Sequence, residues 1–297
     1  MLTGGLTFSL HISMVDPAFY LPVARAAEVA GFDRISMGDS IFYPLESDSR
    51  YPYTADGGRE FLENKPFLEP FSIIPAMAAV TTRIQFAVVV LKLPVRHPVL
   101  VAKQASSVAV ISGNRLRLGV GTSPWPDDFE ILGVPYEGRG RRLEEGIAVI
   151  RGLTAGGYFE HHGEHYDFRP IKLAPVPTAP IPILVGGHSP INIQRAARFG
   201  DGWVAASGDR GKLAPMIQAL HAALAEGGRS RARFEVSVGT PDLEDGVELQ
   251  RLRELGVTDV RVRLGGGYMR EPDSGSLASK LEFIERVGER VLSRLHP

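Results

Sequence analysis

The sequence predicts a closed (β/α)8 barrel, the TIM-barrel form of the α/β class, as a single domain spanning residues 1–297. One repeated pattern carries this prediction: a helical segment ends at a glycine, a short polar link follows, and an apolar run comes next. The pattern occurs around Gly31, Gly113, Gly200 and Gly256. Glycine adopts the left-handed conformation of a helix end at little cost, so each copy marks a helix-to-strand junction. Repeated junctions of this kind indicate strands that alternate with helices and pair in parallel.

Eight strand–helix units can be counted, and that number favours a closed barrel over an open sheet. Short apolar runs are expected to form the strands, at Leu6–Ile12, Arg34–Gly38, Ile84–Leu91, Leu116–Gly121, Ile183–Val185, Gly202–Ala205, Phe234–Val238 and Asp259–Arg263. Helices are expected between them, at Pro17–Ala30, Phe71–Val80, Val99–Ile111, Arg139–Leu153, Ile191–Phe199, Leu213–Ala225, Glu244–Leu255 and Leu277–Leu292.

Two segments are too long for plain connections, and we expect them to be insertions after the second and fourth strands. The first, Ser40–Pro66, contains aromatic residues that predict a loop packed over another part of the protein: Phe42, Tyr43, Tyr51, Tyr53 and Phe61. The second, Ala155–Pro180, has aromatic runs on both sides of a polar turn, which predicts a hairpin.

The composition narrows the possible functions. The formal net charge is −1, so no basic field favours nucleic acid, and no apolar run approaches the length of a membrane span. The absence of cysteine excludes disulfides, thiolate nucleophiles and iron–sulfur clusters. The start of the chain lacks the basic segment of a signal peptide, so we expect a cytoplasmic protein.

The stretch from Ile183 to Pro190 predicts an anion-binding turn. Its apolar run reads as a buried strand, and Gly186 and Gly187 allow a sharp turn. Ser189 and Pro190 are typical of the first positions of a helix. The free N–H groups and the positive end of the helix dipole would favour a phosphate there. The alternative is an ordinary capped strand-to-helix turn.

The expected strand ends are rich in glycine and small hydroxyl side chains and poor in paired carboxylates. This favours a cradle for a bulky cofactor over a hydrolytic site, because active sites of such barrels lie at these ends. His161, His162 and His165 crowd on the expected hairpin, but their spacing matches no standard metal motif, and we predict no metal site. His11 follows the first strand and is either catalytic or a packed histidine.

A set of motifs extends through most of residues 6–205: Arg83–Phe86 with Leu93–Pro98, Arg115–Gly121, Phe129–Pro135, Arg139–Glu145, Ile183–Pro190 and Arg195–Trp203. Together these motifs resemble the bacterial luciferase-like family of flavin- and deazaflavin-dependent oxidoreductases. The last third of the chain is compatible with the family only in its layout.

The resemblance implies a flavin-like ring at the tips of the third and fourth strands, against Gly119, Gly121 and Thr122. It also implies a non-proline cis peptide bulge near Val88–Val89. The same family places a phosphate in the turn after the fifth strand, which agrees with the anion-binding turn predicted here and assigns it to Gly186, Gly187, His188 and Ser189.

The loop after strand two contains Arg50–Tyr53 and Asp56–Gly57. In these residues the chain resembles the subgroup of the family whose members use coenzyme F420, a 5-deazaflavin. Its reactive centre is a carbon atom, so it carries hydride and reacts little with oxygen, while the protein orients it and excludes water. Flavin mononucleotide (FMN) is the alternative cofactor. Its reaction would be monooxygenation, with reduced flavin supplied by a separate reductase.

Two departures from the family concern the catalytic residues. Many relatives have a histidine directly after the aspartate that ends strand two, whereas this chain has Asp39–Ser40. F420-dependent sugar-phosphate dehydrogenases also have a glutamate where this chain has Ser123–Pro124. The absence of both groups counts against sugar-phosphate dehydrogenation. The motif set and the glycine-rich strand ends lead us to expect a mostly apolar organic substrate instead. Asp39 would bond either to the ring's reactive face or to nearby backbone N–H groups. Ser40, His11, Tyr53 or water would deliver the proton.

Other functions stay open at this point. A binding protein could keep the coenzyme without catalysis. A phosphosugar lyase or epimerase would need a Schiff-base lysine or a metal cluster, and Lys92 is the only lysine near an expected strand end. Members of the family often form dimers, so we expect a homodimer.

Overall fold

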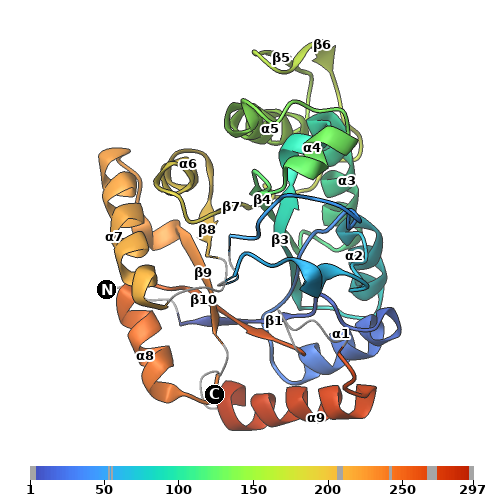
Figure 1. The fold of residues 1–297 in the computed structure, drawn as a ribbon, viewed down its shortest axis with the longest axis vertical. Coiled ribbons are helices and arrows are strands. Elements are labelled where there is room, and N and C mark those ends of the chain that lie inside the picture. Colours follow the sequence, from blue (N-terminus) through green and yellow to red (C-terminus); the bar gives the residue numbers. More distant parts are fainter. Residues whose placement is uncertain are drawn as a thin grey trace.

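The structure, a computed structural model, describes residues 5–52, 54, 56–205, 210–240, 243–265 and 273–293. Its barrel strands pair in parallel in the closed order β1-β10-β9-β8-β7-β4-β3-β2, which confirms the predicted (β/α)8 barrel (Figure 1). The strands are β1 Thr7–His11, β2 Arg34–Met37, β3 Gln85–Lys92, β4 Leu116–Gly121, β7 Ile183–Gly186, β8 Gly202–Val204, β9 Glu235–Thr240 and β10 Asp259–Arg263.

The helices surround the strands, and each predicted helix overlaps an observed one (Figure 1). They are α1 Tyr20–Val29, α2 Pro70–Ala79, α3 Pro98–Ile111, α5 Arg139–Thr154, α6 Pro190–Phe199, α7 Arg210–Glu226, α8 Gly246–Leu255 and α9 Leu277–Val287. Local signals set their ends. The Asp245 side chain accepts the N–H groups of Val247 and Glu248 to begin α8, and Gly256, with φ +90°, ends it.

A short helix, α4 (Pro126–Ile131), is missing from the predicted elements. Six residues are too few to show a helical period, although Pro126 at the first position and two aspartates in the first turn are start signals. None of the described helices is both long and apolar enough to cross a membrane.

Alternation along the barrel strands separates an apolar outer layer from a polar interior. In β10, Val260 and Val262 are fully buried in the apolar core, whereas Arg261 and Arg263 line a cavity inside the barrel. Phe8 in β1 is likewise completely buried. Each large apolar side chain of this outer layer contributes about 1.5–3 kcal/mol to folding.

A layer of charged side chains closes the barrel below the cavity. Arg34 donates to Glu235 at 2.7 Å and lies 3.2 Å from Asp259, while Arg117 lies 2.8 Å from Glu235. Burial raises the pKa of Glu235, and the two arginines oppose that rise. Because two cations face two carboxylates, the layer is balanced in charge and forms a polar floor under the site.

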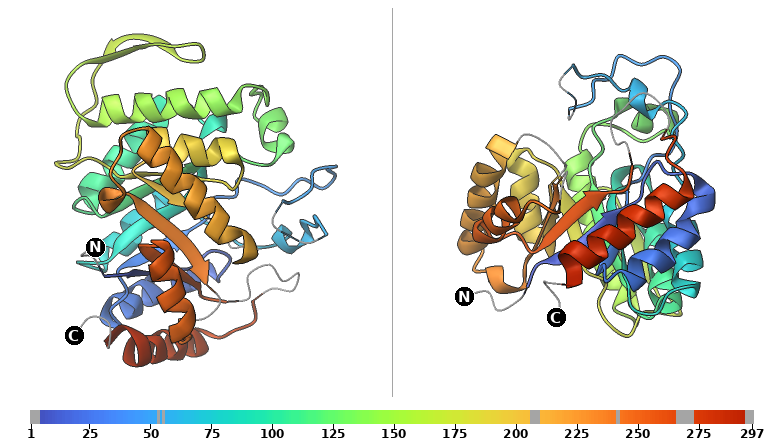
Figure 2. Two further views of the ribbon diagram at one scale, coloured as in Figure 1. Left: turned by 90° about the vertical axis from the view of Figure 1, so that its left-hand side faces the viewer. Right: turned by 90° about the horizontal axis from the view of Figure 1, so that it is seen from below.

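Both insertions occur where they were expected. Strands β5 (Phe159–His162) and β6 (Asp167–Ile171) pair antiparallel, which confirms the hairpin, and they project beyond α5, away from the barrel (Figure 1). The segment after β2 extends outward from the barrel as a long loop, drawn in blue (Figure 2). Its short 3-10 helix is η2 (Glu60–Leu62).

Candidate functional site

A cavity of about 420 Å³ opens at the carboxyl ends of the barrel strands, where the sequence places the active site. Residues from β1, β3, β4, β7, β9 and β10 line it, and the loop after β2 contributes aromatic side chains. A cavity of this size lies in the range that binds small molecules and cofactors.

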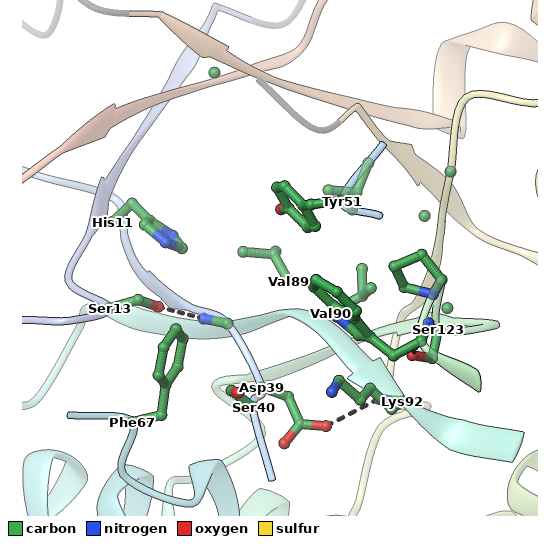
Figure 3. Close-up of a pocket in the computed structure, with 18 of the residues that line it drawn as sticks. His11, Ser13, Asp39, Ser40, Tyr51, Phe67, Val89, Val90, Lys92 and Ser123 are labelled. Atoms are coloured by element: carbon green, nitrogen blue, oxygen red, sulfur yellow. Dashed lines mark hydrogen bonds between the residues drawn. The ribbon is translucent and has the colours of Figure 1, made fainter. Parts of the chain in front are cut away.

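Val89 and Val90 form the central wall of the cavity, between His11 and Ser123 (Figure 3). The peptide bond between them is cis, and the pairing of β3 with β4 shifts register between Val88 and Leu91. The bulge therefore lies one residue later than Val88–Val89. Val88 itself is fully buried in the core.

The glycines of β4 and β7 make room for this bulge. A Cβ atom at Gly119 would lie 2.1 Å from the Val88 carbonyl oxygen, and one at Gly121 would lie 2.7 Å from Val90 Cγ2. One at Gly186 would lie 2.8 Å from Val90 Cγ1. Side chains at these positions would push the valine wall out of place. Gly121 and Gly186 also line the cavity, so the same glycines shape both the bulge and the space beside it.

Asp39 is held by an arginine. Its carboxylate accepts hydrogen bonds from Arg96 Nη1 at 2.8 Å and Nη2 at 2.9 Å, and from the Lys92 N–H at 2.9 Å. Its side chain is only 2% exposed and points toward Lys92, away from His11 (Figure 3). These contacts correspond to the second role expected for Asp39, which is to bond nearby backbone N–H groups. A role at the reactive face stays a prediction.

A second buried ion pair orders the loop after β4. Lys92 Nζ lies 2.7 Å from an Asp128 carboxylate oxygen, and Ser123 Oγ donates to the same carboxylate at 2.6 Å. All three side chains are buried. Lys92 is therefore engaged as a structural cation, which leaves no sign of the Schiff-base lysine that a lyase would need.

His11 lies in the cavity with its Nδ1 3.2 Å from Ser36 Oγ. Burial, together with the positive charges of Arg263 and Arg261, holds the pKa of His11 well below its usual value of 6.5. The ring is therefore neutral at physiological pH and is a weaker base than an exposed histidine. Ser40 also lines the cavity, whereas Tyr53 lies outside the described residues.

The turn between β7 and α6 has the shape that an anion site needs. Gly187 has φ +123°, and a Cβ atom there would lie 2.4 Å from Asn192 Nδ2. The Trp203 indole donates to the Gly187 carbonyl oxygen at 2.8 Å and fixes the turn. Ser189 makes no side-chain cap bond at the start of α6. The first N–H groups of the helix therefore donate no hydrogen bond to that side chain.

An arginine lies near this turn. Arg139, at the start of α5, lines the same cavity as Gly186, Gly187 and Asn192. Its guanidinium lies over the Tyr136 ring at 3.7 Å, and its Nε is buried without a hydrogen-bond partner among the described residues. A buried donor of this kind is costly unless a ligand completes it.

The loop after β2 covers one side of the cavity. Tyr51 stacks on Trp125 with ring centroids 5.4 Å apart, and Ser47 and Ser49 both donate to Asp127 of α4. Tyr51, Phe61 and Trp125 line the cavity. The loop therefore packs over the site, as its aromatic residues predict.

The cavity gathers part of the predicted site. Besides the catalytic candidates His11, Asp39 and Ser40, it is lined by Val89, Gly121, Thr122, Gly186 and Gly187. The described lining does not include Val88, Gly119, His188 or Ser189. His188 packs near Trp203, with ring centroids 6.3 Å apart, and Ser189 is exposed.

Two features of the cavity were not predicted from the sequence: the two arginines of β10 and the inward position of Val90. The run Asp259-Val-Arg-Val-Arg263 alternates charged and apolar residues, which indicates a strand with one polar face. That signal points to Arg261 and Arg263, although it does not tell which face of the strand lines the cavity.

The hairpin histidines lie apart from the cavity. Ligand atoms of Glu145, Glu164 and His165 lie within 4.8 Å of one another. The Glu145 carboxylate, however, accepts the backbone N–H groups of residues 164–166. These bonds give Glu145 a structural role, which is to close the hairpin turn onto α5.

Known proteins resemble this chain over most of its length. The sequence profile described as luciferase-like monooxygenase matches residues 8–241. An uncharacterised protein of Mycobacterium tuberculosis is 49% identical over 98% of this chain and 100% of its own length. An F420-dependent glucose-6-phosphate dehydrogenase of Beutenbergia cavernae is 30% identical, over 75% of this chain and 62% of its own length.

Solved structures share the fold. A monooxygenase from Streptomyces bottropensis, RslO1, superposes with a TM-score of 0.74 at 17% identity, covering 97% of this chain and 99% of its own. An F420-dependent secondary alcohol dehydrogenase, in complex with an F420–acetone adduct, superposes with a TM-score of 0.75 at 15% identity, covering 97% and 98%.

Proposed function

This chain belongs to the luciferase-like monooxygenase family, and we propose that it is an F420-dependent oxidoreductase that transfers a hydride between the deazaflavin and an organic substrate. The observation that carries this proposal is the combination of a valine wall, a glycine turn and Arg139 in one cavity. A planar ring with an anionic tail needs such a flat apolar surface and such a donor-rich end.

The residues present fit the coenzyme. The ring would rest against Val89 and Val90, in space that Gly121 and Gly186 leave open. The phosphate of the tail would bind at the turn of Gly187 and at Arg139. The buried Nε of Arg139 has no hydrogen-bond acceptor among the described residues, and the phosphate would supply one. When bound, F420 supplies the hydride chemistry, and the protein orients it and keeps water out.

The chain's own residues would orient the reacting groups. His11 is neutral at physiological pH and lies across the valine wall from Ser123, so its ring would hydrogen-bond the reacting group of the substrate. Asp39 would act by positioning, since its bonds to Arg96 and Lys92 fix the end of β3 beneath the wall. The aromatic loop after β2 would exclude water from the reacting atoms.

The F420-dependent dehydrogenase relative supports the choice of coenzyme. Glucose 6-phosphate is not the substrate that we propose, because this chain has Ser40 and Ser123 where the resemblance leads one to expect proton-transfer groups. Hydride transfer to a different substrate fits both the shared motifs and these departures.

Fluorescence titration of the purified protein with F420 and with FMN tests the proposal. We expect F420 to bind at least about tenfold more tightly than FMN. Arg139→Gln should weaken F420 binding about tenfold, because a charge-assisted bond is lost. Arg198→Gln, on the exposed side of α6, is the matched control and should leave binding unchanged. Tighter binding of FMN would overturn the choice of coenzyme.

An FMN-dependent monooxygenase is the second candidate. The description of the matching family and the shared fold of RslO1 favour it. It predicts oxygen consumption when reduced FMN and a substrate are both supplied. F420 would then bind no better than FMN.

A further inference from the structure

We infer that Asn192 is a ligand-binding residue of this site: its side-chain amide donates a hydrogen bond to the phosphate of the coenzyme. Arg195, held by Glu144, is the positioning residue that fixes the direction of this amide. The inference deepens the proposed function and rests on it for a phosphate-bearing coenzyme at the turn of Gly187. It adds a neutral, oriented donor to the charged donor already assigned, which is Arg139.

The side chain of Asn192 lies directly against the glycine turn. It lines the cavity together with Gly186 and Gly187. A Cβ atom at Gly187 would overlap Asn192 Nδ2 and would lie 2.9 Å from both Cβ and Cγ of Asn192. A glycine at φ +123° therefore leaves the amide its place beside the turn.

The backbone at the start of α6 offers few donors of its own. Pro190, the first residue of the helix, has no N–H group. The N–H groups of Asn192 and Ile193 donate to the Ser189 carbonyl oxygen, at 2.9 Å and 3.1 Å. Because these donors are missing or engaged, a side-chain donor adds to what the turn can offer a phosphate.

Arg195 determines which end of the Asn192 amide faces the cavity. Its Nη1 donates to Asn192 Oδ1 at 3.0 Å. A guanidinium has only donors, so the amide oxygen has to face it and the amide NH2 group has to point the other way. Nδ2 donates to no described residue, so its N–H bonds are left for a ligand in the cavity.

Arg195 is itself fixed by α5. Its Nε donates to Glu144 Oε1 at 2.7 Å, and its side chain is only 12% exposed. A Cβ atom at Gly140, one turn before Glu144, would lie 2.5 Å from Arg195 Cζ, so this glycine leaves the space that the guanidinium occupies. Since the Glu144 carboxylate balances the charge of Arg195, this arginine acts through the amide and not as a second anion-binding cation.

Helix α5 thereby brings two parts of the phosphate site to one turn. Arg139, its first residue, lines the cavity, and the buried Nε of Arg139 has no hydrogen-bond partner among the described residues. Gly140 and Glu144 of the same helix hold Arg195, and so the Asn192 amide. A phosphate would accept a charge-assisted bond from Arg139 and a neutral bond from the amide, both from groups placed before it binds.

Fluorescence titration of Asn192→Asp with F420, and with the same deazaflavin lacking its phosphate-bearing tail, tests the inference. The carboxylate keeps the size of the amide and still accepts from Arg195, but it turns an acceptor toward the phosphate. We expect F420 binding to weaken at least about tenfold, and binding of the phosphate-free deazaflavin to change less than about twofold. Asn114→Asp, exposed on the α3–β4 connection, is the matched control and should leave both unchanged.

A double-mutant cycle tests the positioning role of Arg195. Arg195→Met should weaken F420 binding about fivefold, because the amide loses the partner that directs it. In an Asn192→Ala background the same change should alter F420 binding less than about twofold. General damage to the fold would instead weaken binding equally in both backgrounds, and would also weaken binding of the phosphate-free deazaflavin.

Unchanged F420 binding in Asn192→Asp, or an equal loss for the phosphate-free deazaflavin, would overturn the inference. Equal effects of Arg195→Met in the two backgrounds would overturn the positioning role. Titration with FMN and riboflavin, which differ only by the phosphate, separates the inference from the choice of coenzyme. If the wild-type protein prefers FMN to F420, and Asn192→Asp removes the advantage of FMN over riboflavin, the proposed coenzyme fails while Asn192 keeps its role.

Discussion

The side chains of the site show how far a residue's partners decide its role. Asp39 looks catalytic in sequence because it ends a barrel strand. In the structure its carboxylate accepts three hydrogen bonds, two from Arg96 and one from the Lys92 N–H. Each carboxylate oxygen is engaged, so the side chain acts on the position of β3.

Asp39→Asn tests this positioning role. The amide cannot match both guanidinium bonds, so we expect the free energy of unfolding to fall by about 2 kcal/mol. Urea denaturation of both proteins measures this change. Asp16→Asn, on an exposed turn, is the control. Unchanged stability in Asp39→Asn, with coenzyme turnover abolished, would instead give Asp39 a role at the reactive face.

His11 predicts a pH dependence of stability. Its pKa is lowered in the folded state by burial, Arg263 and Arg261, while the unfolded chain keeps a value near 6.5. Below pH 6.5 the unfolded state binds more protons, so the free energy of unfolding falls as pH falls. Between pH 6.5 and 5.5 the loss due to His11 should be about 1 kcal/mol.

Urea denaturation of the wild type and of His11→Asn at these two pH values measures that loss. The variant should lack it, while His221, whose pKa burial and Arg231 also lower, contributes equally to both proteins. Parallel profiles for the two proteins would show that His11 is protonated normally in the fold.

At the scale of elements, strands β3, β4 and β7 fit together through glycines. Val90 occupies the space above Gly121 and Gly186, and the same packing opens the cavity beside it. From the sequence, Gly121 and Gly186 are expected only to bind the cofactor, and their packing against Val90 is not predicted. The inward turn of Val90 depends on the register shift between β3 and β4, which no local pattern encodes.

Gly121→Ala should lower the free energy of unfolding by about 1–3 kcal/mol, because the added methyl group meets Val90 Cγ2. The double variant Val90→Ala with Gly121→Ala should recover part of that loss, and the coupling between them can be read from a double-mutant cycle. Gly246→Ala is the control, since no described atom lies within 4 Å of its added Cβ. Additive effects would contradict the packing.

The side chain of Glu28 links α1 to the segment that leads into β3. Partial burial would raise the pKa of Glu28, but the N–H groups of Ile84, Arg83 and Thr82 outweigh this effect and lower the pKa to about 2. The contribution of Glu28 to stability is therefore complete above pH 4.5 and is lost as pH falls toward 2.

Glu28→Gln should destabilise the protein at pH 7 by about 1 kcal/mol, and the difference from wild type should shrink as the pH falls below 4.5. Denaturant midpoints at pH 7, 4 and 3 provide the comparison. Glu282→Gln, exposed on α9, should have no effect at any of these values. A difference that grows toward acid pH would contradict the assigned sign.

At the scale of the whole molecule, most of the architecture follows from local signals. The glycine junctions at Gly31, Gly113, Gly200 and Gly256 predict alternation, and the apolar runs place the strands within a few residues. Among the described α-helices, only the short α4 escapes this reasoning, because six residues cannot show a period.

The site was predicted less completely because it depends on contacts between distant elements. The turn of Gly186 and Gly187 is visible in sequence, since a strand, two glycines and a helix start are adjacent. Arg261 and Arg263 become part of the site only when β10 closes the barrel beside β1. The pairing of Asp39 with Arg96 joins residues 57 positions apart.

A crystal structure of the protein with F420 bound is the most direct test of the account. It should show the phosphate of the coenzyme within hydrogen-bond distance of the Gly187 turn or of Arg139, and the deazaflavin ring against Val89 and Val90. A phosphate bound to Arg261 and Arg263, or a ring that lies away from the valine wall, would contradict it.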